Sequence, residues 1–284
     1  MKIHAFKVEP LGNSQSLEDV LKEIRGDKID ARVRLVNSSE VRIDSIDERD
    51  GVWLMDFAKF RQTQGPGKGS RKSKVVGFDF KKGETFAEET AALFDPGTGY
   101  ILIQYNHSGV RAGAISQYFS EYCQVATNDY SFKPRFDPDT ERRLLKKAIK
   151  RNFSFRIDVT EMSEQDLKRG VALKDAINLG KGCSAGLVNV ILAAGGPKDH
   201  GLGGAFTDML QAVRELAANN PPAVKSVKIS GKENEDAAVE VLDLLVQRLC
   251  VDLDIKPGMD LRLPLEERWK GLFRARAGWK GVLT

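Results

Sequence analysis

The chain has 284 residues, of which 41% are hydrophobic and 30% charged, with a formal net charge of +4. This composition is typical of a globular protein and excludes a wholly disordered one. No apolar stretch approaches the roughly 18–20 residues that a membrane span requires, and the first residues lack the apolar core of a secretory signal.

The three cysteines, Cys123, Cys183 and Cys250, are scattered along the chain. They form neither a CxxC pair nor the Cys/His spacing of a structural zinc site. We therefore expect reduced thiols, a cytoplasmic protein, no metal and no cofactor.

The N-terminal half is predicted to be rich in strands. Residues 2–9 alternate as a strand, and Ser16 is placed to cap a helix with Asp19 three positions on. Gly51 follows a polar cluster and supplies the turn of a hairpin. The further elements expected here are strands at 41–46, 52–57, 75–80, 85–94 and 100–105, and a helix at 109–123.

Beyond two prolines near residue 138 the pattern changes to alternating helices and strands. Pro264 opens the last helix at a position where its missing N–H is harmless. The sequence thus predicts a mixed α+β fold with a strand-rich domain over 1–135 and an α/β domain over 136–284. The elements expected in the second domain are helices at 139–150, 164–178, 206–218 and 235–245 and extended segments at 153–159, 187–193, 224–229 and 248–255.

Positive charge is concentrated in three segments. Residues 61–74 carry +5, residues 133–156 carry +6 and residues 262–280 carry +4, so the rest of the chain, within a total of +4, carries −11. An acidic body with basic segments is the kind of charge asymmetry that attracts polyanions.

The first segment is a glycine-rich loop without acids, and it resembles a basic arm because ordinary loops mix charges of both signs. It lacks the spacing of a nucleotide-binding P-loop. The bases that we expect to contact phosphates here are Lys68, Arg71, Lys72 and Lys74.

The second segment holds a helix predicted over 139–151, with bases on one face and leucines, alanine and isoleucine on the other. Such a helix could lie along a phosphate backbone, and the alternative is a solvated surface helix. Its candidate contacts are Arg142, Arg143, Lys146, Lys147 and Lys150.

In the last helix, Leu265, Trp269, Leu272 and Phe273 form an apolar stripe that favours docking, either within the chain or against a second subunit. Four bases are expected to project from it, and Arg274 and Arg276 are the candidate phosphate contacts among Arg268, Arg274, Arg276 and Lys280.

Enzyme motifs are weak. Residues 182–186 (GCSAG) match the nucleophile-elbow string, but the elbow needs a strand before it and a helix after it, and here the order is reversed. The glycines around Lys198, Asp199 and His200 lack an ordered phosphate-binding spacing. Acids near Lys81 and Lys232 are better explained as turn and helix-start residues than as a nuclease site, and His107 has no evident partner.

Three segments resemble a group of bacterial and phage-borne phage-defence proteins. They are a strand that ends in SGKENED at 230–236, LIQYN at 102–106 and LRLPL at 261–265 before a final basic helix. The group includes the DNA-binding subunit of the Kiwa system and the RexA phage-exclusion protein. The resemblance implies sequence-tolerant binding of duplex DNA by a homodimer that senses or restrains phage, and it carries over no catalytic residue.

The sequence therefore predicts a nucleic-acid-binding protein rather than an enzyme, acting chiefly through phosphates. Two alternatives remain at this point. One is a protein-interaction component of a defence or toxin–antitoxin-like system, which would bind an acidic partner such as a phage protein. The other is a metal-dependent nuclease or hydrolase.

Overall fold

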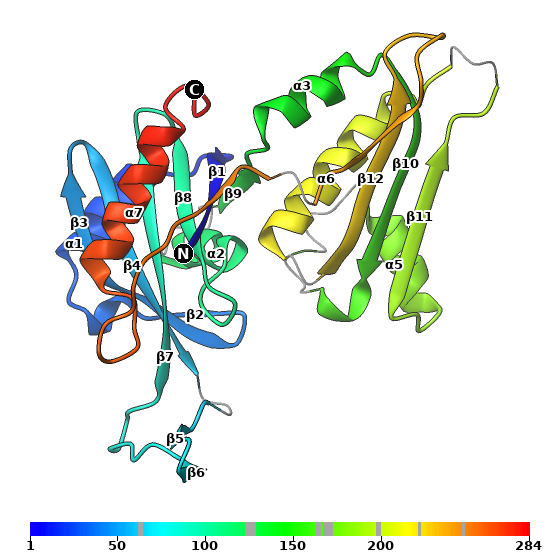
Figure 1. Ribbon diagram of the computed structural model, residues 1–284. Coiled ribbons are helices and arrows are strands. Elements are labelled where there is room, and N and C mark those ends of the chain that lie inside the picture. The colour runs from blue at the N-terminus through cyan, green and yellow to red at the C-terminus, as the bar shows by residue number, and fades with distance from the viewer. Residues whose placement is uncertain are drawn as a thin grey trace. The chain divides into compact units, whose positions relative to one another are not determined.

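The structure is a computed structural model that describes residues 1–61, 65–122, 129–162, 166, 173–196, 200–220, 223–245 and 248–284 (Figure 1). Over these residues the chain forms six α-helices and fourteen strands, which confirms the predicted α+β class. No helix within the described ranges is long and apolar enough to cross a bilayer.

The chain divides into two compact units that are interleaved in sequence. The first comprises residues 1–2, 10–130 and 253–277, and the second comprises 3–9, 131–252 and 278–284. The last helix therefore belongs with the strand-rich unit, whereas the sequence had placed it in the C-terminal domain.

The first unit is built on an antiparallel sheet with the strand order β8-β7-β4-β3-β2. Its strands are β2 (Arg34–Val36), β3 (Ser39–Arg49), β4 (Val52–Arg61), β7 (Phe86–Asp95) and β8 (Tyr100–Tyr105). Asp50 and Gly51, with φ of 52° and 71°, form the turn between β3 and β4. Two successive residues with positive φ match the twist of a hairpin, so the hairpin predicted from Gly51 is confirmed.

Helices cover both faces of this sheet. They are α1 (Leu17–Gly26), α2 (Ala112–Tyr122) and α7 (Leu265–Gly278). Phe57 of β4 packs edge-on against Tyr118 and Phe119 of α2, whereas the neighbouring Asp56 contacts Arg268 of α7. Successive residues of a strand point to opposite faces, so α2 and α7 lie on opposite sides of β4. Ser16 caps α1 as predicted, because its Oγ accepts a hydrogen bond from the Asp19 N–H at 3.2 Å.

The second unit holds an antiparallel four-stranded sheet in the order β11-β10-β12-β13. One face carries the core, in which Phe153, Phe155 and Ile157 of β10 are fully buried. The unit also contains strand β1 (Lys2–Leu11), which pairs with β9 (Asp129–Pro134) and β14 (Cys250–Asp252). Its helices in the described ranges are α3 (Pro138–Lys146), α5 (Lys174–Gly182) and α6 (Ala205–Asn219), with a short 3-10 helix at Val159–Glu161. The sheet strands are β10 (Ile149–Asp158), β11 (Leu187–Ala193), β12 (Val224–Lys232) and β13 (Glu240–Asp243).

Three predicted elements were wrong or misplaced. Residues 235–245 were expected to be helical, but Glu240–Asp243 is the edge strand β13, in which Leu242 pairs with Ile229 and is buried. The basic helix was expected to reach residue 150, but α3 ends at Lys146 and β10 begins at Ile149. The strand expected at 75–80 is only the short β6 (Ser73–Val76). Tertiary pairing with β12 overrides the local helical pattern in the first two cases.

Several predictions fall wholly or partly outside the described residues. They concern Cys123, Lys198, Asp199 and the first part of the helix expected at 164–178, of which α5 covers Lys174–Gly182. Cys183 and Cys250 are free, exposed thiols.

Candidate nucleic-acid interface

A basic arm, which we define as residues 65–85, extends from the sheet of the first unit between β4 and β7 (Figure 1). Strands β4 and β7 remain paired up to Arg61 and Phe86, so the arm is an insertion beyond a closed ladder. Within the arm, β5 (Lys68–Ser70) pairs with β6 (Ser73–Val76) as a small two-stranded ribbon. Every residue from 66 to 84 is exposed, so the arm contributes almost nothing to the core.

The arm's bases are fully available to solvent. Lys68, Arg71, Lys72 and Lys74 are all exposed, and none of them forms an ion pair with a carboxylate in the described part of the chain. The structure thus brings together the four bases predicted for this loop, on one short ribbon. An unneutralised cluster of this kind raises the local potential that an approaching polyanion meets.

Three phenylalanine rings gather at the base of the arm. Phe86 packs edge-on against Phe78 and Phe80, with ring centroids 5.4 and 4.7 Å apart. Phe78 and Phe80 stay 44% and 45% exposed. A Cβ at Gly65 would lie 2.0 Å from the Phe86 ring, so only glycine lets the chain pass the cluster this closely. Exposed rings beside bases are the combination that single-stranded nucleic-acid grooves use for stacking.

The basic helix of the second unit is neutralised in large part. Asp137 caps α3 through hydrogen bonds to its Oδ1, and Pro138 fills the first helical position. Because the helix ends at Lys146, Lys147 turns inward and is only 1% exposed, with its ammonium on the carboxylate of Glu240. A buried lysine cannot reach a phosphate, so Lys147 is removed from the candidate surface.

The other bases of this segment divide into paired and unpaired ones. The guanidinium of Arg143 also binds Glu240, with Nε 2.7 Å from Oε1, and Arg142 pairs with Asp139 at 2.9 Å across an exposed turn. Lys150 lies on β10 instead of on the helix and donates to the carbonyl of Lys147. Lys146 is exposed and has no ion pair among the described residues. The hydrogen bonds from Lys147 and then Arg143 lower the pKa of Glu240.

The last helix uses most of its predicted surface for docking. Trp269 and Leu272 are buried, and the Trp269 Nε1–H donates to the carbonyl of Met55 at 3.3 Å. Arg268 was expected to project but is 2% exposed and binds Asp56 through both Nη atoms. The centre of the stripe, Trp269 and Leu272, therefore packs within the chain, whereas Leu265 and Phe273 stay partly exposed.

Of the two candidate bases on α7, the structure leaves one unpaired. Arg276 donates from Nε to Asp95 at 2.7 Å, whereas Arg274 is exposed. Arg274 is near the C-terminal end of the helix, and the arm leaves the opposite end of the sheet (Figure 1). Arg274 and the arm do not form one continuous patch.

The weak enzyme motifs that fall on described residues lie in turns. Residues 182–186 connect the end of α5 to β11, and Ser184 has φ of 53°, so the helix-to-strand interpretation is confirmed. The Lys81 N–H donates to Glu84 at 2.9 Å, and the Asn234 side chain accepts from the Asp236 N–H at 3.1 Å. These acids and amides stabilise local turns.

Sequence reasoning missed two features that involve β4. One is the buried ion pair between Asp56 of β4 and Arg268 of α7, and the other is Lys59 of β4. Asp56 lies in the otherwise apolar run 52–58, and a lone acid in such a run signals a buried partner. Lys59 lines a pocket with His107, for which the sequence offered no partner. The residues of that pocket come from three separate segments, so no local pattern pointed to it.

Fold and surface together define an α+β protein whose first unit carries an exposed basic and aromatic arm. Residues 12–261 match the family model DUF6731, described as a family of unknown function, and the chain belongs to this family. No curated protein matches the sequence.

Proposed function

We propose that this protein binds nucleic acid, with duplex DNA as its main ligand, and that the arm makes the principal contacts. The observation that carries the proposal is the group of four exposed bases without ion pairs among the described residues, on an arm whose residues 66–84 are all exposed. An arm that buries no core is not needed for folding, so its composition is free to serve a ligand.

The binding is expected to be electrostatic and sequence-tolerant. Bases on an exposed, glycine-rich ribbon reach phosphates, which are the same at every position of a duplex. Each neutralised phosphate releases counterions, so affinity falls steeply with salt. The exposed rings of Phe78 and Phe80 provide stacking surfaces for an unpaired base at a strand end or a distorted site. Arg142, Lys146 and Arg274 are secondary candidates because each remains exposed.

The first prediction concerns the arm. The variant Lys68→Ala/Arg71→Ala/Lys72→Ala/Lys74→Ala should bind random duplexes much more weakly. The negative slope of log K against log salt should become shallower by about 3–4, because each lost phosphate contact removes about 0.9 from its magnitude. Electrophoretic mobility shift at several salt concentrations measures both quantities. The loss should be equal for unrelated sequences.

The matched control replaces four exposed lysines of the same unit that lie off the arm, Lys22, Lys28, Lys256 and Lys270, by alanine. It changes net charge by the same amount and should largely preserve the slope. Equal effects of the two variants would contradict the arm as the contact surface. A wild-type protein that binds no duplex even at low salt would favour the acidic protein partner instead.

We propose the phage-defence role and the homodimer on a separate basis, the resemblance of residues 102–106, 230–236 and 261–265 to phage-defence proteins. The test is plaque formation on cells that express the wild type or the arm variant. Protection that requires the arm bases would support the role, and equal plaque counts with and without the protein would oppose it.

A further inference from the structure

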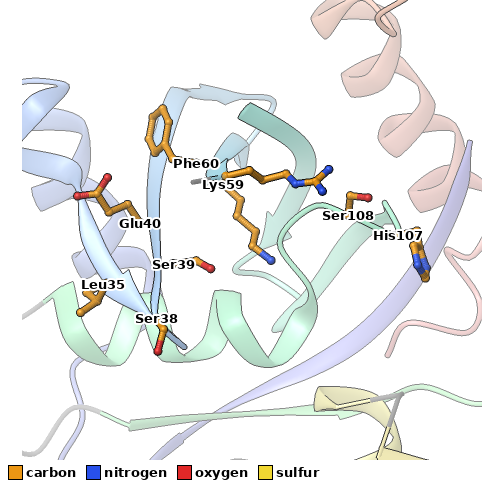
Figure 2. A pocket seen from close by; sticks show the side chains of 9 residues that line it. Leu35, Ser38, Ser39, Glu40, Lys59, Phe60, His107 and Ser108 are labelled. Carbon is orange, nitrogen blue, oxygen red and sulfur yellow. The ribbon is translucent and has the colours of Figure 1, made fainter. Parts of the chain in front are cut away.

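A pocket of about 500 Å³ opens on the first unit where the β2–β3 turn, the end of β4 and the segment after β8 meet. Figure 2 shows Ser39 and Lys59 extending toward the hollow from neighbouring strands, and Ser108 lies on the other side with its hydroxyl turned away from Lys59. The polar residues that line it are Ser38, Ser39, Glu40, Lys59, Arg61, His107 and Ser108.

The turn between β2 and β3 fixes one side of the pocket. Val36 pairs with Ser39 across a two-residue loop, in which Asn37 and Ser38 have φ of 47° and 62°. Two left-handed residues of this kind form a tight hairpin turn that Asn and small polar residues tolerate. The turn places Ser38 and Ser39 at the wall of the pocket, and each has a hydroxyl that can donate a hydrogen bond. In Figure 2 the Ser39 side chain is the one of the two that extends toward Lys59.

The pocket holds an unneutralised positive charge. Lys59 is half-buried and forms no ion pair with any carboxylate that the structure describes. Its pKa lies below the usual value, first because burial desolvates the ammonium and then because Arg111 and Arg61 add positive charge nearby; Glu88, opposite Lys59 on β7, offsets part of this effect. Arg61 is matched by Glu88 at 3.0 Å. Glu88 is therefore shared with Arg61, and a half-buried ammonium without an ion pair of its own favours a bound anion.

The acidic group at the rim does not supply that counter-charge. Glu40 lines the pocket, but Figure 2 shows its carboxylate turned away from the ammonium of Lys59. Glu88 is engaged by Arg61, and Asn106 also lies near it. An incoming anion would therefore meet Lys59 together with the serine hydroxyls.

We propose that this pocket binds a phosphate monoester, with Lys59 as counter-charge and Ser38, Ser39 and Ser108 as hydrogen-bond donors. Several hydroxyl donors and an ammonium suit the three terminal oxygens of a phosphate better than the two of a carboxylate. The volume lies in the range of small-ligand pockets, so the nucleotide that bears the phosphate can enter as well.

The source of the phosphate is a free nucleotide or the 5′ end of a nucleic acid. Arg61 ends β4 close to where the arm starts, so a strand held by the arm could place its terminal phosphate in the pocket. This second source rests on the proposed function, whereas nucleotide binding does not.

The test is isothermal titration of the full chain with adenosine 5′-monophosphate and with adenosine at low salt. We expect saturable binding of the monophosphate alone. Lys59→Gln should weaken it about tenfold or more, and Ser39→Ala by a few-fold, because hydrogen bonds to charged groups are the stronger ones. Lys28→Gln, at an exposed lysine away from the pocket, should leave binding unchanged. Equal binding of adenosine, no saturable binding, or equal effects of Lys28→Gln and Lys59→Gln would overturn the proposal.

A second measurement separates the two sources and keeps this inference distinct from the proposed function. Duplexes with 5′-phosphate and 5′-hydroxyl ends are compared on the wild type, Lys59→Gln and the fourfold arm variant. A Lys59-dependent preference for the phosphorylated end identifies a nucleic-acid terminus, and monophosphate binding without that preference identifies a free nucleotide. Monophosphate binding by the arm variant, together with loss of duplex binding, supports both proposals separately. Duplex binding by the wild type without monophosphate binding overturns the pocket alone.

Discussion

Glu240 is a single carboxylate that serves two bases from another part of the chain. It accepts hydrogen bonds from Arg143, which is exposed, and from Lys147, which is buried. The ammonium of Lys147 is buried away from water, so Glu240 is the counter-charge that offsets the desolvation of this positive charge. The lysine is therefore part of the fold.

This arrangement predicts the effect of Glu240→Gln. At neutral pH the variant should lose about 1–3 kcal/mol of unfolding free energy, because a buried ammonium is left with a neutral partner while solvent screens the exposed side of the site. Adding Lys147→Met should recover most of the loss by removing the buried charge. Urea unfolding measures both, and a double variant as unstable as the single one would contradict the assignment.

The ion pair between Glu240 and Lys147 also makes the unfolding free energy depend on pH. The folded-state pKa of Glu240 is lowered, first by the hydrogen bond from Lys147. A lowered pKa means that the ionised carboxylate stabilises the fold above the unfolded-state value and that this contribution is lost as pH falls through the folded-state value. The wild type should thus lose more stability than Glu240→Gln between about pH 5 and about pH 3. Parallel stability curves would refute this contribution.

The pKa of Asp56 in the first unit is shifted in the direction opposite to that of Glu240. Burial raises its pKa to about 6, against the hydrogen bonds from Arg268, which lower it. Glu89 lies 3.3 Å from the same guanidinium and also pairs with Arg262. Two acids and two arginines thus connect β4 and β7 to α7 and the segment before it.

At the scale of elements, the arm is separable from the sheet that carries it. Strands β4 and β7 are paired through Arg61 and Phe86, and residues 66–84 lie in solvent beyond that pair. Loop length affects folding free energy only weakly.

Replacing residues 66–84 by a short Gly-Ser linker should therefore change the unfolding free energy by less than about 1 kcal/mol. Duplex binding should fall as far as in the fourfold arm variant. Thermal unfolding and mobility shift on the same preparation give both results. A clearly lower unfolding midpoint would mean that the arm packs on the sheet after all.

The elements that sequence patterns predicted well are those with strong local signals. Ser16 and Gly51 are capping and turn residues whose effects depend on their immediate neighbours. The prediction for the segment that contains β13 was wrong because its residues follow a helix-like pattern. Burial of Leu242 beside Ile229 is decided instead by pairing with the partner strand.

At the scale of the whole molecule, chain order and spatial order differ. Residues 253–277 return to the first unit after the second unit is complete. Their helix brings Trp269 and Leu272 to the sheet and supplies Arg268 for the buried Asp56.

A fragment of residues 1–135 should consequently fail to fold cooperatively, although it matches the domain expected from the sequence. It lacks α7, which leaves apolar surface uncovered and Asp56 without its arginine. Urea unfolding followed by circular dichroism tests this, and a peptide of residues 253–280 should restore a transition. A cooperative transition of the fragment alone, at the midpoint of the full chain, would contradict it.

The sequence by itself determined the α+β class, the cap and turn residues and the position of the arm, because each depends on neighbours within a few residues. It also located the four arm bases, because the side chains of an exposed, glycine-rich loop remain in solvent. Only the tertiary structure decided which of the other bases stay available. Glu240 lies 97 positions from Arg143, and Asp56 lies 212 positions from Arg268. Ion pairs form wherever folding brings opposite charges together, and that distance in sequence leaves no local pattern to read.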